Sequence, residues 1–282
     1  MSSIVLAAAL AALTNLVTSP IPTTADASAV IPARCDRSGA LRIAVSVEGT
    51  EPRVFILDTG SSLGFIDQRI ASALRLPAAG RIASGQGHAA LVGVKLTIAG
   101  IALPMLSMVS GDSTGLNEVL SRSDAGILGN DVLRALGRVT VDHAKCRLIV
   151  GEAKVQGRHA LVRLDWHQGR PVVAMPGAGR LLLDSGATMM TVFDGSTAAA
   201  TFRGTHGAAS VVKIQRVSGD AVARLGFIPS LAAGAVELSN VPALAVRSWY
   251  ENDPTAPDGL LPLALFSSVY FNSVEGYAIL MR

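Results

Sequence analysis

Two aspartates in the chain, Asp58 and Asp184, stand in nearly the same local context. Each follows a run of apolar residues and precedes a hydroxyl residue and a glycine, in the stretches Val-Phe-Ile-Leu-Asp-Thr-Gly-Ser-Ser and Leu-Leu-Leu-Asp-Ser-Gly-Ala-Thr. A carboxylate at the end of a buried strand is costly to desolvate unless hydrogen bonds or a partner group compensate. One such turn would most often only cap local N–H groups, but matched turns in both halves of the chain indicate a paired site.

A pair of carboxylates held a hydrogen bond apart has a defined chemistry. The two groups cannot both be ionised, so they share one proton and titrate as a unit. The ionised carboxylate can take a proton from a water molecule that attacks a carbonyl group, while the protonated one polarises the carbonyl oxygen. This chemistry needs no metal and no cofactor, and no spacing of cysteines or histidines suggests zinc ligation.

The residues around Asp58 predict a β-rich unit. Residues 41–47 alternate apolar and polar side chains, and after a turn the run 54–57 leads into Asp58, which together predict a hairpin. The other elements expected in this half are a helix over 66–76, a strand over 92–98, a loop over 110–124, a helix over 131–136 capped by Asn130 and ended by Gly137, and a closing hairpin over 139–150.

The second half of the chain repeats this plan. The two aspartates are offset by 184 − 58 = 126 residues, and the closing hairpins, which start at Val139 and Val269, by 269 − 139 = 130. A nearly constant offset indicates an internal duplication. We therefore expect an all-β protein of two similar β-barrel-like lobes with short helices, over residues 35–152 and 158–282, with the active site at their interface.

An Asp-Thr/Ser-Gly turn after an apolar strand, followed some 70 residues later by an apolar-apolar-Gly segment, resembles the aspartic peptidase superfamily. The short lobe, the Ile-Leu-Gly-Asn-Asp-Val-Leu helix start and the Val-Thr-Val-Asp…Arg-Leu ending are similar to retropepsin-like units of bacteria, here fused in tandem. The resemblance covers about residues 40–282. It implies that Asp58 and Asp184 form the catalytic dyad of an aspartic endopeptidase in a two-lobed, pepsin-like arrangement.

The resemblance also assigns supporting roles to the neighbours of the dyad. The hydroxyls of Thr59 and Ser185 would bond across the lobe junction and keep the two turns rigid. Two glycines, Gly60 and Gly186, would let backbone N–H groups approach the carboxylates, which a β-carbon would crowd. The hydroxyl of Ser61 can donate to Asp58 and favour its ionised form, whereas Ala187 offers Asp184 no such group. The hypothesis is that Asp58 is the base and Asp184 the acid.

Two other regions depart from the family pattern. The glycine-rich stretch Gly85, Gln86, Gly87 and His88 lies where a hairpin flap would cover the cleft, and residues 218–220 could be its counterpart, but neither carries the tyrosine of pepsin-like flaps. In the second lobe, Leu260-Leu261-Pro262 replaces the apolar-apolar-Gly segment. Since proline has no N–H and a fixed φ, a backbone hydrogen bond behind Asp184 is expected to be missing.

The composition bounds the setting in which the protein works. The net charge of +3 over 282 residues, without a cluster of Lys or Arg, supports no nucleic-acid or anionic-membrane partner. The first 27 residues predict a signal peptide, cleaved after Ala27 or Ala29, and hence a secreted or periplasmic protein; an uncleaved start is the alternative. No stable membrane anchor is expected.

The two cysteines, Cys35 and Cys146, either form a disulfide or stay as buried thiols.

The sequence thus predicts an exported, cofactor-free aspartic endopeptidase that acts as a monomer on polypeptide substrates. The rival hypothesis is a catalytically inactive two-lobed envelope protein that binds extended peptides in the same cleft. The Leu-Leu-Pro departure and the tyrosine-free flap favour the rival, whereas two Asp-hydroxyl-Gly turns favour the enzyme. A third possibility is that each lobe pairs with its own kind in a dimer.

Overall fold

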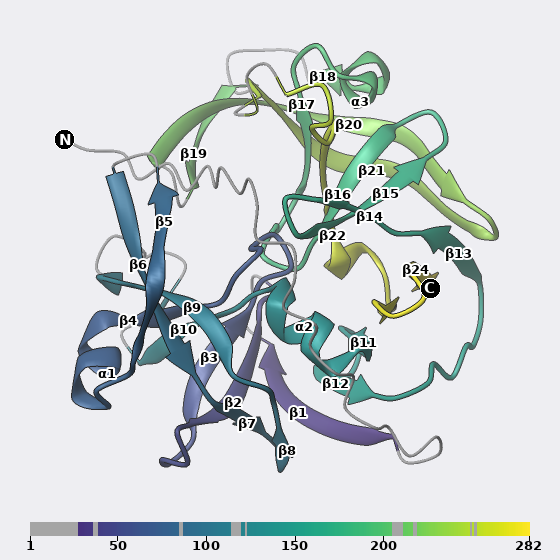
Figure 1. The fold of residues 1–282 in the computed structure, drawn as a ribbon. Coiled ribbons are helices and arrows are strands. Elements are labelled where there is room, and N and C mark those ends of the chain that lie inside the picture. Colours follow the sequence, from purple (N-terminus) through teal and green to yellow (C-terminus); the bar gives the residue numbers. More distant parts are fainter. Residues whose placement is uncertain are drawn as a thin grey trace.

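The protein folds into two β-lobes that are joined by a shared sheet (Figure 1). The computed structural model describes residues 28–35, 39–84, 87–113, 120–121, 123–204, 211–216, 219–248, 250 and 253–282. Within these residues, helices are short and few: α1 (Gln68–Ala73), α2 (Asn130–Leu136), α3 (Thr197–Thr201) and the 3-10 helix η3 (Leu263–Leu265). None of the helices in the described part of the chain is long and apolar enough to cross a membrane.

The sheet of the first lobe has the strand order β1-β2-β3-β10-β4-β9-β6-β5. Its strands are β1 (Ala29–Cys35), β2 (Leu41–Val47), β3 (Arg53–Leu57), β4 (Phe65–Asp67), β5 (Ala78–Ser84), β6 (Gly87–Val94), β9 (Leu106–Gly111) and β10 (Asp124–Leu128), with β7 (Leu96–Ile98) and β8 (Ile101–Ala102) beside β2. Strand β10 lies between β3, to which it is parallel, and β4, to which it is antiparallel. The expected hairpin over 41–57 is confirmed as β2–β3.

The sheet of the second lobe has the order β14-β15-β16-β22-β17-β21-β20-β18, with β19 paired to β20. Its strands are β14 (Asp165–His167), β15 (Arg170–Met175), β16 (Gly179–Asp184), β17 (Met190–Phe193), β18 (Arg203–Gly204), β19 (Val211–Arg216), β20 (Gly219–Ala233), β21 (Val236–Val246) and β22 (Gly259–Pro262). Strand β22 lies parallel to β16 and antiparallel to β17, as β10 lies between β3 and β4. The two lobes therefore place an equivalent strand next to each Asp turn.

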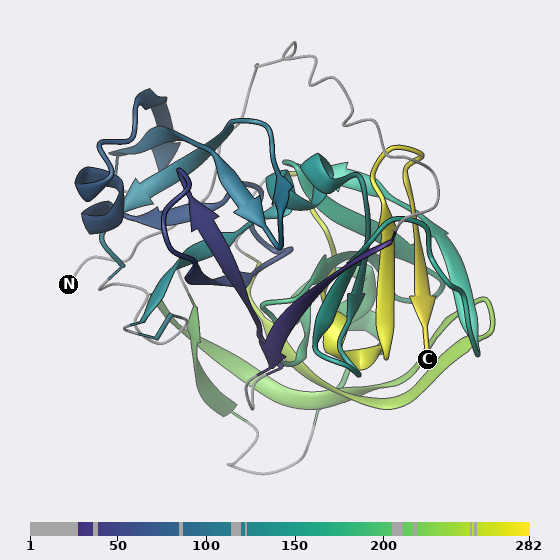
Figure 2. The same cartoon turned by 90° about the horizontal axis from the view of Figure 1, so that it is seen from below.

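The closing hairpins of the two halves pair with each other and form the shared sheet. Its strands are β1, β11 (Arg138–Asp142), β12 (Arg147–Val150), β13 (His159–Arg163), β23 (Ser268–Asn272) and β24 (Tyr277–Met281), in the order β13-β24-β23-β11-β12-β1. Strands β11 and β23 are antiparallel, with Val139 opposite Phe271. Figure 2 shows the yellow hairpin β23–β24 next to the teal strands of the first half. The first half of β1 pairs with β12 and its last residues pair with β2, so β1 connects the shared sheet to the first lobe.

Buried side chains of both lobes form one continuous core. The alternating strand β2 contributes Leu41, Ile43, Val45 and Val47, all fully buried, and its polar side chains face outwards. The runs that precede the two aspartates are buried on both faces, because successive side chains, which point to opposite faces of the sheet, are all buried over residues 55–57 and 181–183. A strand that is covered on both sides needs a continuous apolar run, which is the pattern of these two segments.

Two expected helix boundaries differ from the structure. The helix expected over 66–76 begins only at Gln68, since Phe65–Asp67 form β4 and pair with β10; Asp67 then caps the helix by accepting from the Arg69 N–H. The expected N-cap role of Asn130 is wrong. Gly129 occupies the N-cap position without a side-chain bond, and Asn130 is the first residue of α2, so its amide is free for other partners.

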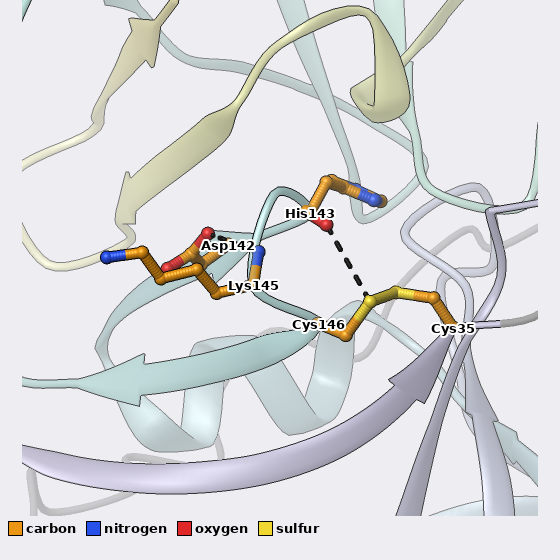
Figure 3. The surroundings of a disulfide bond; sticks show 5 residues. All are labelled: Cys35, Asp142, His143, Lys145 and Cys146. Atoms are coloured by element: carbon orange, nitrogen blue, oxygen red, sulfur yellow. Dashed lines mark hydrogen bonds between the residues drawn. A yellow bond between two sulfur atoms is a disulfide. The ribbon is translucent and has the colours of Figure 1, made fainter.

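A disulfide joins Cys35 and Cys146, 111 residues apart in sequence, with their Cα atoms 5.6 Å apart. Figure 3 shows that it connects the end of β1 to the turn between β11 and β12. Asp142 stabilises this turn, because its carboxylate accepts hydrogen bonds from the Lys145 N–H at 3.0 Å and from Arg147 Nε at 2.8 Å. Of the two alternatives open for the cysteines, the structure contains the disulfide.

Candidate active site

The two Asp turns face each other across the lobe interface. Asp58 directly follows β3, and its N–H donates to the Leu128 carbonyl at the end of β10. Asp184 is the last residue of β16, opposite Pro262 of β22. The two carboxyl groups are neighbours, because each lies against the glycine of the opposite turn and the negative charge of Asp58 raises the pKa of Asp184. The fold thus brings the two sequence-predicted aspartates together.

The glycine after each aspartate makes this approach possible. A β-carbon on Gly60 would lie 2.7 Å from Oδ2 of Asp184, and one on Gly186 would lie 2.8 Å from Oδ1 of Asp58. Each glycine N–H donates to the aspartate of its own lobe, at 2.8 Å to Asp58 and 2.7 Å to Asp184. Any side chain here would push into the carboxylate of the opposite lobe, so these two positions require glycine.

Reciprocal hydrogen bonds between Thr59 and Ser185 join the two turns. The Thr59 N–H donates to Ser185 Oγ at 3.0 Å, and the Ser185 N–H donates to Thr59 Oγ1 at 2.8 Å. Each hydroxyl then donates to a backbone carbonyl of the other lobe, Thr59 to Leu183 at 2.7 Å and Ser185 to Leu57 at 3.0 Å. Both hydroxyl residues are buried. Because every donor and acceptor in this network is satisfied, it fixes the two lobes against each other at the dyad.

The surroundings of the two carboxylates differ. Burial, and after it the negative charge of Asp58, holds the pKa of Asp184 well above its ordinary value, against the opposing effect of the Gly186 and Ala187 N–H donors. Asp58 is more exposed and accepts from Ser61 Oγ at 2.7 Å. The arrangement therefore favours the protonated form of Asp184.

We expect Asp184→Asn to increase the stability of the fold at neutral pH. A carboxyl whose pKa is raised on folding binds its proton more tightly in the native state, so its contribution to stability is greatest below about pH 4 and declines as pH rises above that value. At pH 7 the unfolded chain releases this proton more readily than the native state does, which lowers the free energy of unfolding. Asparagine has no such proton, so we expect the free energy of unfolding to rise by an amount on the order of 2 kcal/mol at pH 7 and to change little near pH 4. Thermal unfolding at both pH values checks this, and an equal gain at pH 4 would contradict it.

Asn130 supports the first turn and was missed as a site residue from sequence. Its side-chain amide donates to the carbonyls of Thr59 and, at 3.1 Å, Ser61, and it is buried. The neighbouring Asp131 accepts from the Gly64 N–H at 3.0 Å. The signal that could identify Asn130 from sequence is a polar side chain directly after the buried Ile-Leu-Gly strand, a position that equally fits a helix cap.

The second turn has no equivalent of this support. The residue that follows the apolar segment there is Pro262, and then Leu263, which begins η3 and is fully buried. In the first lobe a β-carbon at Gly129 would lie 2.5 Å from the backbone of Leu63, so the chain after Asp58 runs close over that glycine. In the second lobe Pro262, which has a β-carbon, occupies the place of Gly129, so the chain after Asp184 cannot run as close over it. The turn of Asp58 is therefore the more tightly constrained of the two.

The expected flap corresponds to the β5–β6 hairpin. Gly85 and Gln86 lie outside the described residues, Gly87 begins β6, and His88 is exposed on β6 opposite Ala83. In the second lobe β19 and β20 form a comparable hairpin; residue 218 lies outside the described residues, and 219–220 begin β20. Both hairpins lie on the same side of the molecule in Figure 1. Their role as flaps over a cleft stays a prediction.

Two cavities, of about 400 and 560 Å³, lie away from the dyad. The smaller is lined by residues near the disulfide, including His143 and Phe266, and the larger by residues of the first lobe, including Arg53 and Asp67. Within the described part of the chain, no group of three or more His, Cys, Asp or Glu side chains is arranged to hold a metal ion. Neither cavity therefore contains the two aspartates, which remain the candidate site at the lobe interface.

Comparison with known proteins agrees with this geometry. The family model described as aspartyl protease matches the chain twice, over residues 43–132 and 174–263, which supports the internal duplication. Among solved structures, the crystal structure of basic 7S globulin from soybean is similar in fold, with a TM-score of 0.52 and 10% sequence identity, over 90% of this chain and 96% of that one. A search of curated proteins found no match. Since the two family matches together span more than half of its residues, the chain belongs to the aspartyl protease family.

Proposed function

We propose that the protein is an exported aspartic endopeptidase in which Asp58 and Asp184 together activate a water molecule. The observation that carries the proposal is the pair of neighbouring carboxyl groups with unequal surroundings at the lobe interface. Each lobe, over residues 35–152 and 158–282, supplies one of the two groups. Since one chain provides both, a monomer contains a complete site.

The geometry supports a division of roles between the two carboxyls. Asp58, with Ser61 as a hydrogen-bond donor, takes a proton from the water as it attacks the peptide carbonyl. Asp184, whose pKa is raised by burial, carries the proton that polarises the carbonyl oxygen and later passes to the leaving amine. The Thr59–Ser185 network keeps the carboxyls in place, so that little reorganisation is needed during the reaction.

Export is supported by the disulfide, which persists in oxidising compartments. The predicted signal peptide, residues 1–27, lies outside the described residues. Between its two candidate cleavage sites, the fold favours the one after Ala27. Cleavage after Ala29 would remove the first residue of β1, which pairs with Val150.

Digestion of a denatured protein mixture by the mature chain, from pH 3 to 8, tests the proposed function. We expect cleavage that a statine-type transition-state inhibitor blocks and that the Asp58→Asn/Asp184→Asn double variant lacks. Gel filtration of the active fraction tests whether the active protein is a monomer.

The second candidate, an inactive peptide-binding protein, is favoured by Pro262 and by the unsupported second turn. Folded protein that binds peptides but cleaves none at any pH would establish it instead.

Replacing Asn130 by leucine, the residue at the equivalent place in the second lobe, should lower kcat roughly tenfold to a hundredfold and change KM little. The two turn carbonyls lose their buried donor, and a small displacement of a catalytic group has effects of this size. Steady-state kinetics on a peptide substrate check this, with circular dichroism to verify folding. Unchanged kcat in folded Asn130→Leu would show that the amide does not position Asp58.

A further inference from the structure

The hairpin β14–β15 of the second lobe packs against the loop that follows Asp58. At its turn, a β-carbon on Gly169 would lie 3.3 Å from the Ser62 β-carbon. Next to this contact, the Arg134 guanidinium of α2 lies over the Trp166 ring at 5.6 Å. The hairpin therefore reaches the lobe junction where the first catalytic turn ends.

Arg170, the next residue after Gly169, donates its hydrogen bonds to neutral groups in the part of the chain that the structure describes. Its Nη1 donates to the Tyr250 hydroxyl at 2.8 Å, its Nη2 to Gln168 Oε1 at 2.9 Å, and its Nε to the His167 carbonyl at 3.4 Å. These contacts use three of the five N–H groups of a guanidinium, which leaves one on each terminal nitrogen. Among the described residues, no acidic side chain forms an ion pair with Arg170.

The guanidinium lies against a half-buried aromatic ring, that of Tyr250. It lies 5.3 Å from the centre of the Tyr250 ring, and that ring makes edge contacts with Phe193 at 5.6 Å and with His167 at 5.2 Å. Phe193 and His167 are buried. Burial first, and then the charge of Arg170, lower the pKa of His167, although Asp253, 3.5 Å from His167 Nε2, acts in the opposite direction. The neighbouring imidazole therefore stays neutral over a wider pH range.

The position of Arg170 is close to the proposed reaction. Three residues separate Asp58 from Ser62, so their Cα atoms are four chain steps and at most about 14 Å apart. A substrate in extended conformation covers the same distance with about four residues. A side chain of a bound peptide within about four positions of the scissile bond can therefore reach the β14–β15 turn.

We infer that Arg170 binds a carboxylate of the peptide substrate, so that the enzyme prefers an acidic group at one position near the scissile bond. A planar guanidinium with one free N–H on each terminal nitrogen can bind the two oxygens of a carboxylate together. The inference deepens the proposed function and depends on it. The carboxylate comes from an Asp or Glu side chain or from the C-terminus of the peptide.

A set of matched peptides tests the inference. Starting from a cleaved sequence, each peptide carries Glu or Gln at one of the four positions on either side of the scissile bond, and a further pair ends in a free carboxylate or an amide. We expect one pair in which the charged peptide has about tenfold higher kcat/KM, the size typical of one charge-assisted hydrogen-bonded contact. In Arg170→Gln this ratio should fall to about one.

Two further variants serve as controls. Arg224→Gln removes an exposed arginine that pairs with Asp194, and it should leave the ratio unchanged. Arg170→Lys keeps the charge without the planar fork and should retain part of the preference. A charged-to-neutral ratio that is the same in wild type and in folded Arg170→Gln would overturn the inference and would show that Arg170 only holds Tyr250.

Binding measurements separate this inference from the proposed function. Fluorescence anisotropy with labelled peptides on the Asp58→Asn/Asp184→Asn variant reports recognition without cleavage. If no protein cleaves but the acidic peptide still binds more tightly, and this difference requires Arg170, the inference stands and the peptidase proposal fails. If cleavage occurs and neither assay distinguishes Glu from Gln or acid from amide, the peptidase proposal stands and the inference fails.

Discussion

Replacing either Asp58 or Asp184 by asparagine should lower kcat/KM for a peptide substrate by at least about 1,000-fold. Asparagine has nearly the shape of a protonated aspartate, and its carbonyl oxygen can accept the glycine N–H at each turn, at 2.8 Å for Asp58 and 2.7 Å for Asp184. The fold therefore tolerates the change. The chemistry does not, because one variant lacks the base and the other lacks the proton that polarises the substrate.

The pH dependence of the residual activity distinguishes the two roles. A base must be ionised, so its titration produces the acidic limb of the pH–rate profile, and an acid must be protonated, so its titration produces the alkaline limb. With the Asp184 pKa raised by burial and by the charge of Asp58, we expect Asp184→Asn to lose the alkaline limb and Asp58→Asn the acidic one. If Asp184→Asn instead abolished the acidic limb and Asp58→Asn kept it, the assignment would be wrong.

The control for this experiment is Asp194→Asn. Asp194 is an exposed aspartate of the second lobe that pairs with Arg224 at 2.6 Å. Its replacement should leave both limbs and kcat/KM unchanged, since an exposed ion pair contributes little to stability and has no contact with the dyad. A loss of activity there comparable to that at Asp58 would mean that the dyad variants reduce activity through general damage to the fold.

Much of this site could be predicted from sequence because each part depends on a local pattern. The alternation in β2 and the apolar runs before Asp58 and Asp184 are short-range signals, and the repeat of the whole pattern indicates the second lobe. The expected partners within each turn, such as the Ser61 hydroxyl on Asp58, lie within three residues and are found in the structure.

The remaining features depend on contacts that are distant in sequence. Asn130 supports a turn 71 residues earlier, and only the parallel pairing of β10 with β3 brings them together. The hydroxyl partner of Arg170 is Tyr250, 80 residues later. The helix expected over 66–76 lost its first residues to β4, because pairing with β10 competes with helical periodicity. In each case a tertiary contact decided the role of a residue that local sequence left open.

Breaking the disulfide should be the most destabilising change outside the core. The bond closes a loop of 111 residues, for which the chain-entropy model gives about 4 to 5 kcal/mol at 25 °C. It also fixes the end of β1, the strand that belongs to both the shared sheet and the first lobe. We expect Cys35→Ala/Cys146→Ala to lower the free energy of unfolding by about 4 kcal/mol in denaturant titrations, with dyad geometry and cleavage preserved at low temperature.

Single variants show whether the cross-link or the side chains carry this effect. If the disulfide constrains the unfolded chain, Cys35→Ala alone removes the whole constraint and costs nearly as much as the double variant. If the two sulfurs contributed only by packing, the single losses would add up to the double. Cys146 has a φ of 46°, so glycine there would relieve backbone strain and obscure the comparison, which is why alanine is used at both positions. Additive single losses would contradict the entropic account, whereas equal single and double losses would assign the stability of the β1 connection to the covalent bond itself.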